Sequence, residues 1–332
     1  MSATFLRRRT GVFAKVSQEQ IVLVVVVALF VVFGVTLDGF LHVSNLVNLV
    51  RSVSSLGIFG VAMAVVVIAR GMDLSLIASM GVATAVAIQL MHTQVSTPVA
   101  LVAGLGIVLV MGLLNGFLIA FIEVPALFAT LASGLLVYGL ARATVLDGLI
   151  AELPGDRHFV LALGQGTLLG VPVPIILFVV TAVLAQIVLS RTKAGRFVYA
   201  HGDNASAAAL TGIAVRPLTV LEYTASAAIG FVGGLVVAGS VGGLNTQVID
   251  STLIYDVLLV VVVGGISLVG GRGSVLSVVA GTALIGVMLN GMTILNMNTH
   301  EQDIVKGLIL LAALVLDNRL HPRDEETVRQ GE

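Results

Sequence analysis

Residues that could do chemistry are few in this sequence, and their spacing excludes most catalytic sites. The histidines lack the His-x-x-x-His and His-Glu-x-x-His spacings that place metal ligands on one helix face. No cysteine is present, so the chain has no disulfide, thiolate metal site or cysteine nucleophile. No Gly-x-x-x-x-Gly-Lys-Ser/Thr phosphate loop occurs either. We therefore expect no enzyme activity, no metal site and no cofactor in this chain.

Three carboxylates, Asp73, Glu222 and Asp256, lie in or beside apolar segments. A charge without a partner in such a segment costs a few kcal/mol, so each carboxylate should have a partner or a role. An ion-coupled transporter would place two carboxylates near the middle of the membrane, and only Glu222 and Asp256 could form that pair. Glu222 follows Pro217 by about one turn, which favours the cytoplasmic interface.

The segments that carry these residues are typical of a membrane protein. Of the 332 residues, 58% are hydrophobic and 11% are charged, and the mean hydropathy is +1.10. Soluble proteins carry roughly 25% charged residues, and the net charge of -1 excludes nucleic acid as the main partner. Uniformly apolar runs argue against a β-barrel, whose strands alternate in polarity. The sequence predicts an all-α polytopic membrane protein of about ten transmembrane helices, some of them broken or re-entrant. The predicted spans are 20–37, 46–69, 74–92, 97–121, 126–144, 171–190, 218–240, 253–270, 274–294 and 304–318.

The positions of Lys and Arg orient these spans. With ten crossings, most of the basic residues share the side of the two termini, and the exceptions are Arg51, Arg142, Arg157 and Lys306. The positive-inside rule therefore predicts that both termini are cytoplasmic. The predicted organisation is a cytoplasmic tail at 1–19, one transmembrane domain at 20–318 with a cytoplasmic loop at 191–217, and a cytoplasmic tail at 319–332.

Glycine is abundant, with 37 residues, and two clusters fall within or beside predicted spans. One cluster runs from Gly230 to Gly243, and the other runs from Gly264 to Gly273. Small residues let helix backbones approach closely in lipid, so tight packing is one interpretation. The other interpretation is a broken helix beside a substrate route, because irregular backbone at membrane depth is tolerated only against protein or a water-filled cavity.

The polar loop at 191–217 contains a predicted stub helix. Asn204 can cap the start of a helix and Gly212 can end it, and the segment between them is rich in alanine. A helix of roughly two turns with so small a face gains little from folding alone. We therefore expect a cytoplasmic partner to pack against it.

Four segments resemble a known family. They are Tyr199-Ala200-His201-Gly202-Asp203-Asn204 with Ala207-Ala208, Leu210 and Gly212-Ile213; Arg70-Gly71-Met72-Asp73-Leu74-Ser75; Leu114-Asn115-Gly116 with Val124-Pro125 and Ala129-Thr130-Leu131; and Asp256 with Gly264-Gly265-Ile266-Ser267-Leu268 and Gly270-Gly271-Arg272-Gly273-Ser274. Together they resemble the ribose-type permeases of bacterial ABC importers, which belong to the branched-chain amino acid and sugar permease superfamily. The first segment is similar to that family's cytoplasmic loop, and the resemblance extends along most of the chain.

The resemblance implies two sets of functional residues. The ATPase-coupling loop would use Gly195, Tyr199, Gly202, Asn204, Ala207, Ala208, Leu210 and Gly212. Translocation or gating would use Asp73, Ser75, Asn115, Pro125, Thr130, Asp256, Gly264, Gly265, Gly270 and Gly271. Because Asp73 and Asp256 match family positions, a structural or gating role is favoured for both, such as capping a helix N-terminus.

Some positions depart from the family pattern. Arg70 stands where the family often has Gly, Glu123 stands near a usual Lys, and Ile254 occupies a common Glu position. Asp203 replaces a Gly. These departures leave the substrate and the ATPase partner open.

The family implies a permease subunit of an ATP-driven ABC importer in the bacterial inner membrane. It would carry a ribose-like monosaccharide or related polyol by alternating access. Its partners would be cytoplasmic ATPase subunits that bind ATP-Mg, a periplasmic substrate-binding protein and a second permease chain, identical or not. An ion-coupled secondary transporter and an ABC permease for branched-chain amino acids are the alternatives. With no Trp, 4 Tyr and 13 Phe, the chain is expected to leave sugar discrimination to the binding protein.

Overall fold

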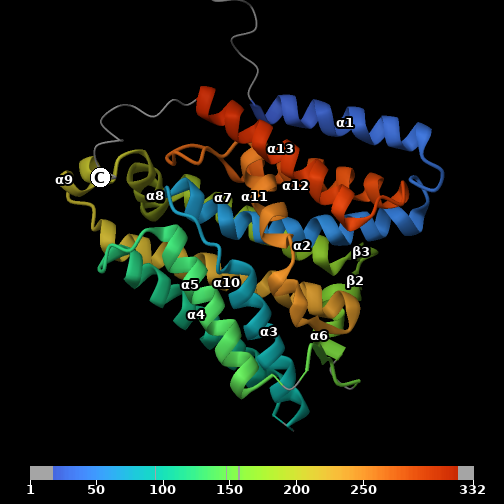
Figure 1. The fold of residues 1–332 in the computed structure, drawn as a ribbon, viewed down its shortest axis with the longest axis horizontal. Coiled ribbons are helices and arrows are strands. Elements are labelled where there is room, and N and C mark those ends of the chain that lie inside the picture. The colour runs from blue at the N-terminus through green and yellow to red at the C-terminus, as the bar shows by residue number, and fades with distance from the viewer. Residues whose placement is uncertain (1–17, 94, 147, 156–157, 321–332) are drawn as a thin grey trace, which may run out of the picture.

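The structure is a computed structural model that describes residues 18–93, 95–146, 148–155 and 158–320 (Figure 1). The two predicted tails lie almost wholly outside these residues. The apolar helices are α1 (Gln18–Thr36), α2 (Val43–Ile68), α3 (Leu76–His92), α4 (Thr97–Ala120), α5 (Ala126–Thr144), α7 (Val173–Arg191), α10 (Val215–Val241), α11 (Leu253–Gly264), α12 (Val275–Ile294) and α13 (Thr299–Leu320). The all-α prediction is confirmed.

The remaining elements are short and lie between the apolar helices. They are α6 (His158–Gln165), α8 (Lys193–Asp203), α9 (Ala205–Leu210), the 3-10 helix η1 (Thr246–Asp250), and the strands β1 (Ile150–Glu152), β2 (Thr167–Leu168), β3 (Val171–Pro172) and β4 (Gly243–Asn245). The strands form two antiparallel pairs, β1 with β4 and β2 with β3.

Within the described residues, seven helices are long and apolar enough to cross a membrane: α1, α2, α4, α5, α7, α10 and α12. The helix α3 is apolar but shorter, and α13 carries charged residues along its 22-residue length. The helix α11 has 12 residues, so it extends about 18 Å at 1.5 Å per residue, less than the roughly 30 Å of a bilayer core. The predicted span at 253–270 is therefore wrong at its C-terminal end, because the chain leaves the helix at Gly265, whose φ is +106°.

The helix ends lie at two opposite faces of the molecule. Figure 1 shows α8 and α9 at one end and the β2–β3 hairpin at the other, and these ends are called the loop face and the hairpin face below. Near the start of α1, Glu19 accepts a hydrogen bond of 2.6 Å from Ser274. Near the end of α13, Asp317 accepts one of 3.3 Å from the backbone N–H of Leu268. Both ends of the described chain therefore lie at the loop face, as an even number of crossings requires.

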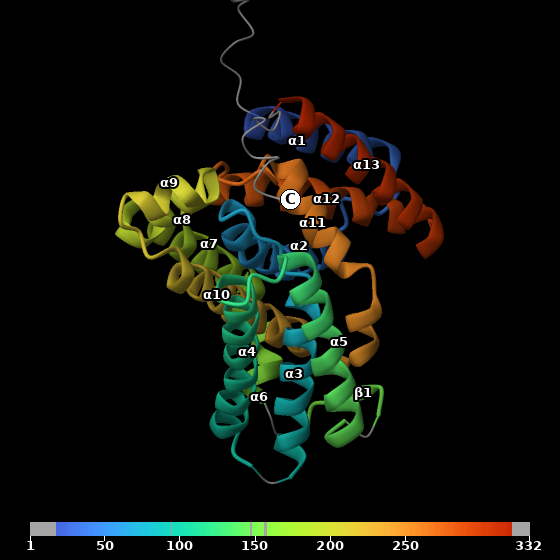
Figure 2. The ribbon, with the colours of Figure 1, turned by 60° about the vertical axis from the view of Figure 1, so that its left-hand side comes forward.

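The helices α2 and α10 form the centre of the bundle. Most buried side chains of the main core come from α2, α3, α7, α11 and α12, and α10 packs against α2, α3 and α4. Figure 2 shows α3, α4 and α5 side by side below this core, with α1 and α13 above it. The outer helices α1, α4, α5 and α7 expose many Val, Leu and Ile side chains, as helices that face lipid do.

The two glycine clusters do different things. The helix α10 continues without a break through Gly230 and Gly239, which lie against other helices, so the first cluster serves tight packing. The second cluster ends α11 and forms the irregular segment 265–274, in which Gly265, Gly270 and Gly271 have positive φ. Tight packing therefore holds for the first cluster and a broken helix for the second, while a substrate route beside that break stays a prediction.

Candidate coupling and gating site

The loop between α7 and α10 folds into two short capped helices at the loop face. The hydroxyl of Thr192 accepts a hydrogen bond of 3.1 Å from the backbone N–H of Gly195 at the start of α8. The side-chain oxygen of Asn204 accepts one of 2.9 Å from the N–H of Ala207 at the start of α9. Gly212, just beyond α9, has a φ of +87°. The stub helix predicted between Asn204 and Gly212 is therefore confirmed.

The helix α8 is fastened to the 265–274 segment and to the end of α2. The hydroxyl of Tyr199 donates a hydrogen bond of 2.9 Å to the carbonyl of Gly273. Burial, assisted by the nearby carboxylate of Glu19, raises the pKa of Tyr199, so this hydroxyl keeps its proton as the donor. The N–H of Gly271 donates a hydrogen bond of 2.8 Å to the carbonyl of Ile68. A Cβ atom at Gly202 would overlap that same carbonyl, so only glycine lets α8 approach this closely.

The helix α9 presents a small and largely exposed face. Ala207 and Ala209 are exposed, and Leu210 is 90% exposed. Ala208 is only 4% exposed and packs against its own chain. The exposed surface of α9 is therefore centred on Leu210, while Ala208 holds α9 in place.

Four of the residues predicted for translocation or gating meet where α2 turns into α3. One carboxylate oxygen of Asp73 accepts hydrogen bonds from the hydroxyl of Ser75 at 2.6 Å and from its backbone N–H at 3.1 Å. The side-chain amide of Asn115, on α4, donates a hydrogen bond of 2.8 Å to the hydroxyl of Ser75. On α5, the hydroxyl of Thr130 accepts a hydrogen bond of 3.2 Å from the N–H of Leu74. Asp73 therefore lies two residues before Ser75, the N-cap residue of α3, and fixes Ser75 in place.

The helix α10 completes this junction with two residues that sequence reasoning missed. The hydroxyl of Ser226 donates 3.3 Å to the second carboxylate oxygen of Asp73. The hydroxyl of Tyr223 donates a hydrogen bond of 3.3 Å to the carbonyl of Met72 and accepts one of 3.2 Å from the N–H of Met72. Their spacing of three residues places both on one face of α10, which is the signal that could have found them. The resulting network, called the junction below, joins α3, α4, α5 and α10 and is almost fully buried.

The remaining predicted residues lie outside the junction. Pro125 precedes α5 and lines a cavity of about 610 Å³ at the loop face, which His201 and Glu222 also line. Gly264 packs against the backbone of α12, and Gly265, Gly270 and Gly271 belong to the 265–274 segment.

Glu222 joins α8 to α10. Its carboxylate lies 3.1 Å from the imidazole of His201, and the side chains are 2% and 12% exposed respectively. The next residue along α10 is Tyr223, which belongs to the junction. Neighbouring residues of α10 therefore contact α8 and the turn that leads into α3.

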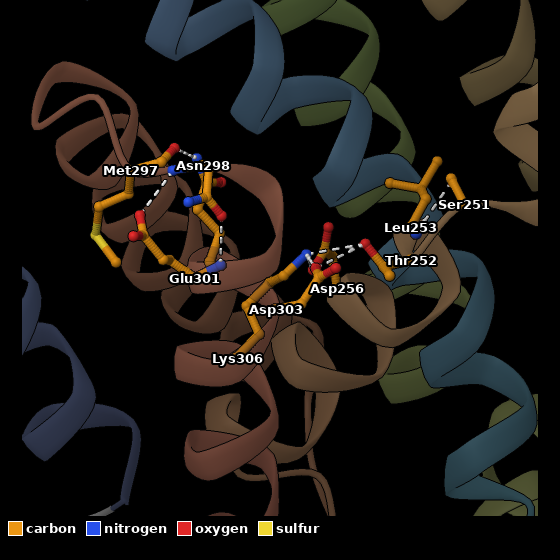
Figure 3. Close-up of polar contacts among 10 residues, drawn as sticks. Ser251, Thr252, Leu253, Asp256, Met297, Asn298, Glu301, Asp303 and Lys306 are labelled. Carbon is orange, nitrogen blue, oxygen red and sulfur yellow. Dashed lines mark hydrogen bonds and ion pairs between the residues drawn. The ribbon is translucent and has the colours of Figure 1, made fainter.

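Asp256 has a cationic partner that sequence reasoning did not assign (Figure 3). The ammonium of Lys306 lies 3.0 Å from the carboxylate of Asp256 and 2.9 Å from that of Asp303. It also donates 3.0 Å to the hydroxyl of Thr252. Lys306 is only 7% exposed, so Asp256 serves as the counter-ion of a buried lysine.

A polar stripe on α2 was also missed. Asn45, Asn48, Ser52 and Ser55 recur every three or four residues, so they share one helix face. They line a cavity of about 570 Å³ together with residues of α11, α12 and α13, Asp256 and Lys306 among them. The 3-4-3 spacing can be read from the sequence, but the apolar residues around it make the segment resemble an ordinary membrane span.

The fold and these contacts define a multi-pass membrane protein of the transport permease class. Residues 45–314 match the family model described as branched-chain amino acid transport system / permease component, and the chain belongs to this family in its ribose-type branch.

Curated relatives match along nearly the whole chain. The ribose import permease protein RbsC of Haemophilus influenzae is 29% identical over 305 residues, which cover 91% of this chain and 94% of that protein. The L-arabinose transport system permease protein AraH of Escherichia coli is 33% identical over 310 residues, 92% of each chain. The probable ABC transporter permease protein YphD of Escherichia coli is 33% identical over 309 residues, 92% of this chain and 91% of that protein. No solved structure matches the chain.

Proposed function

We propose that this chain is the permease subunit of an ATP-driven importer for a sugar, a ribose-like monosaccharide or related polyol, in the bacterial inner membrane. The observation that carries the proposal is α9, a capped stub of six residues that holds Leu210 90% exposed at the loop face. A helix of only six residues gains little stability from its own folding, so contact with a protein partner would account for it. The ribose and L-arabinose permeases among the relatives support a sugar as substrate.

In this proposal the loop face is cytoplasmic and binds the ATPase subunits, which hold ATP-Mg. The hairpin face receives the periplasmic substrate-binding protein, and a second permease chain completes the passage. Closure of the ATPases would move α8 and α9. Because Tyr199 and Glu222 tie α8 to the 265–274 segment and to α10, that movement would reach the junction and tilt the helices around it.

An ion-coupled secondary transporter is the main alternative. It calls for a pair of carboxylates that share an ion, and Glu222 and Asp256 were the residues that could form one. Each of them instead has its own basic partner, His201 for Glu222 and Lys306 for Asp256. This observation favours the ATP-driven proposal. A branched-chain amino acid remains the alternative substrate that the family description names.

The test is uptake by proteoliposomes that contain this chain with the ATPase and the binding protein encoded beside it. We expect uptake of radiolabelled D-ribose or L-arabinose that requires ATP and the binding protein. Uptake that an ion gradient drives without the ATPase would contradict the proposal. Uptake of L-leucine in place of the sugars would show that the substrate is a branched-chain amino acid and not a sugar.

A further inference from the structure

The cavity of about 570 Å³ is lined by residues from the ends of α2, α11, α12 and α13 that lie toward the hairpin face. Its lining on α2 begins at Asn45 in the first turn and reaches Phe59, which is about 21 Å further along at 1.5 Å per residue. That depth is roughly two thirds of a bilayer core of about 30 Å. On α12 the lining runs from Thr293 to Gly286 in the same direction. The volume lies within the range of about 300–1,000 Å³ that is usual for small-molecule sites.

Hydrogen-bonding groups are concentrated at the outer end of this cavity. The side-chain amides of Asn45 and Asn290 exchange two hydrogen bonds, of 3.0 and 2.9 Å, across the gap between α2 and α12. Each amide holds a donor and an acceptor, so this pair can exchange its mutual bonds for bonds to a ligand that offers both. A sugar hydroxyl is both a donor and an acceptor, and adjacent hydroxyls repeat the pattern.

The hydroxyls that line the cavity are arranged to accept. Ser55 donates 3.0 Å to the carbonyl of Ser52, and Thr293 donates 2.9 Å to the carbonyl of Leu289. Because each proton is used within its own helix, the oxygen lone pairs are left for an incoming donor. A ligand rich in hydroxyls therefore recovers here the hydrogen bonds that it loses on leaving water.

The charges of the cavity favour a neutral ligand. Within its lining, the charged side chains are Asp256 and Lys306, which pair at 3.0 Å. Lys306 is also satisfied by Asp303 at 2.9 Å and by Thr252 at 3.0 Å. A phosphorylated sugar or a zwitterionic amino acid would have to break these contacts to find a counter-ion, which leaves a buried charge unpaired and costs several kcal/mol.

We infer that this cavity is a low-affinity binding site for a neutral, polyhydroxylated ligand on the hairpin-face half of the passage. The inference rests on the proposed function, since it names the place where the imported sugar first contacts the permease. The polar stripe of α2 supplies partners for hydroxyls, while Phe59 is the one aromatic side chain in the lining, which agrees with leaving sugar discrimination to the binding protein.

The absence of cysteine from the chain allows a direct test. Ser52→Cys places one thiol in the cavity, and Ser96→Cys places one on the hairpin face outside its lining. The full-length variants are reconstituted alone, without ATPase or binding protein, and labelled with a membrane-impermeant maleimide. D-ribose and L-arabinose should slow labelling of Ser52→Cys by about tenfold at ten times their dissociation constant, and they should leave Ser96→Cys unchanged.

Second substitutions in the Ser52→Cys background locate the ligand. Asn290→Leu removes one amide of the pair, and Thr293→Val removes a lining hydroxyl while keeping the shape. Either should weaken protection by the sugars several-fold. Thr144→Val is the matched control, because Thr144 donates 2.7 Å to the carbonyl of Leu140 just as Thr293 does to Leu289, but lies outside the cavity.

The outcomes separate this inference from the proposed function. A thiol at Ser52→Cys that does not react, sugars that give no protection, or equal protection by L-leucine would each overturn the inference. If ATP-driven uptake by the complete importer persists in that case, the proposed function stands and the cavity is not the site. If protection is found without ATP-driven uptake, the cavity binds sugar and the proposed function is wrong.

Discussion

The imidazole of His201 lies 3.1 Å from the carboxylate of Glu222, and this contact joins the loop-face helix α8 to the central helix α10. Both partners are largely buried, so neither can replace the other with water at low cost. The contact therefore ties α8 to the helix that carries Tyr223 and Ser226, the two residues through which α10 holds the start of α3.

His201→Ala should destabilise the protein by about 1–3 kcal/mol, because it leaves the buried carboxylate of Glu222 without its partner. Adding Glu222→Met should recover much of this loss, since an apolar side chain of similar volume is acceptable at a site where an unpaired buried carboxylate is not. Thermal unfolding in detergent measures both effects. His42→Ala, at an exposed histidine, is the control. A double variant less stable than His201→Ala would contradict this account of the pair.

Thr130→Val should cost about 1–3 kcal/mol, because the isosteric change removes the acceptor of the Leu74 N–H at the junction. Thr144→Val is its control on the same helix. The hydroxyls of Thr130 and Thr144 both donate to the carbonyl four residues earlier, at 2.8 and 2.7 Å, but Thr144 is exposed. Equal unfolding temperatures for the two variants would show that the junction does not depend on Thr130.

Arg70→Gly should raise stability by up to about 1 kcal/mol, because Arg70 has a φ of +66°, a region that costs residues with a Cβ atom and not glycine. Arg196→Gly, in the helical backbone of α8, should lower stability by about 1 kcal/mol instead. Unfolding temperatures of the two variants check the opposite signs. A loss at Arg70→Gly would mean that its side chain contributes more than its backbone costs.

The helices and the stub were predictable, whereas the pairing of polar residues was not. Uniform apolarity located the helices, and the capping preference of Asn204 located α9. The end of α11 was missed, because a glycine in an apolar run predicts packing as readily as a helix end. Lys306 and Asp256 lie 50 positions apart, and only the packing of α11 against α13 brings them together. The same holds for the junction, whose members come from separate helices.

A reporter inserted after Asp203, at the loop face, should report the cytoplasm, and one inserted after Gly155, beside β1, should report the periplasm. The excess of Lys and Arg on the side of the termini is the physical reason. Alkaline phosphatase and green fluorescent protein fusions give complementary signals for the two compartments. A periplasmic signal after Asp203 would invert the orientation and place the polar cavity on the cytoplasmic side.

ATP hydrolysis by the complete importer is the measurement that tests the central claim most directly. Leu210→Asp puts a charge at the centre of the exposed face of α9, where desolvation by a partner would be costly. Leu169→Asp makes the same change on the hairpin face. Leu169 is 97% exposed, and Leu210 is 90% exposed. With equal amounts of each variant in proteoliposomes, we expect Leu210→Asp to lose the copurifying ATPase, and with it substrate-stimulated hydrolysis, by about tenfold, the equivalent of 1.4 kcal/mol, and Leu169→Asp to keep the copurifying ATPase. Normal ATPase binding and stimulated hydrolysis in Leu210→Asp would contradict the assignment of α9 as the docking site.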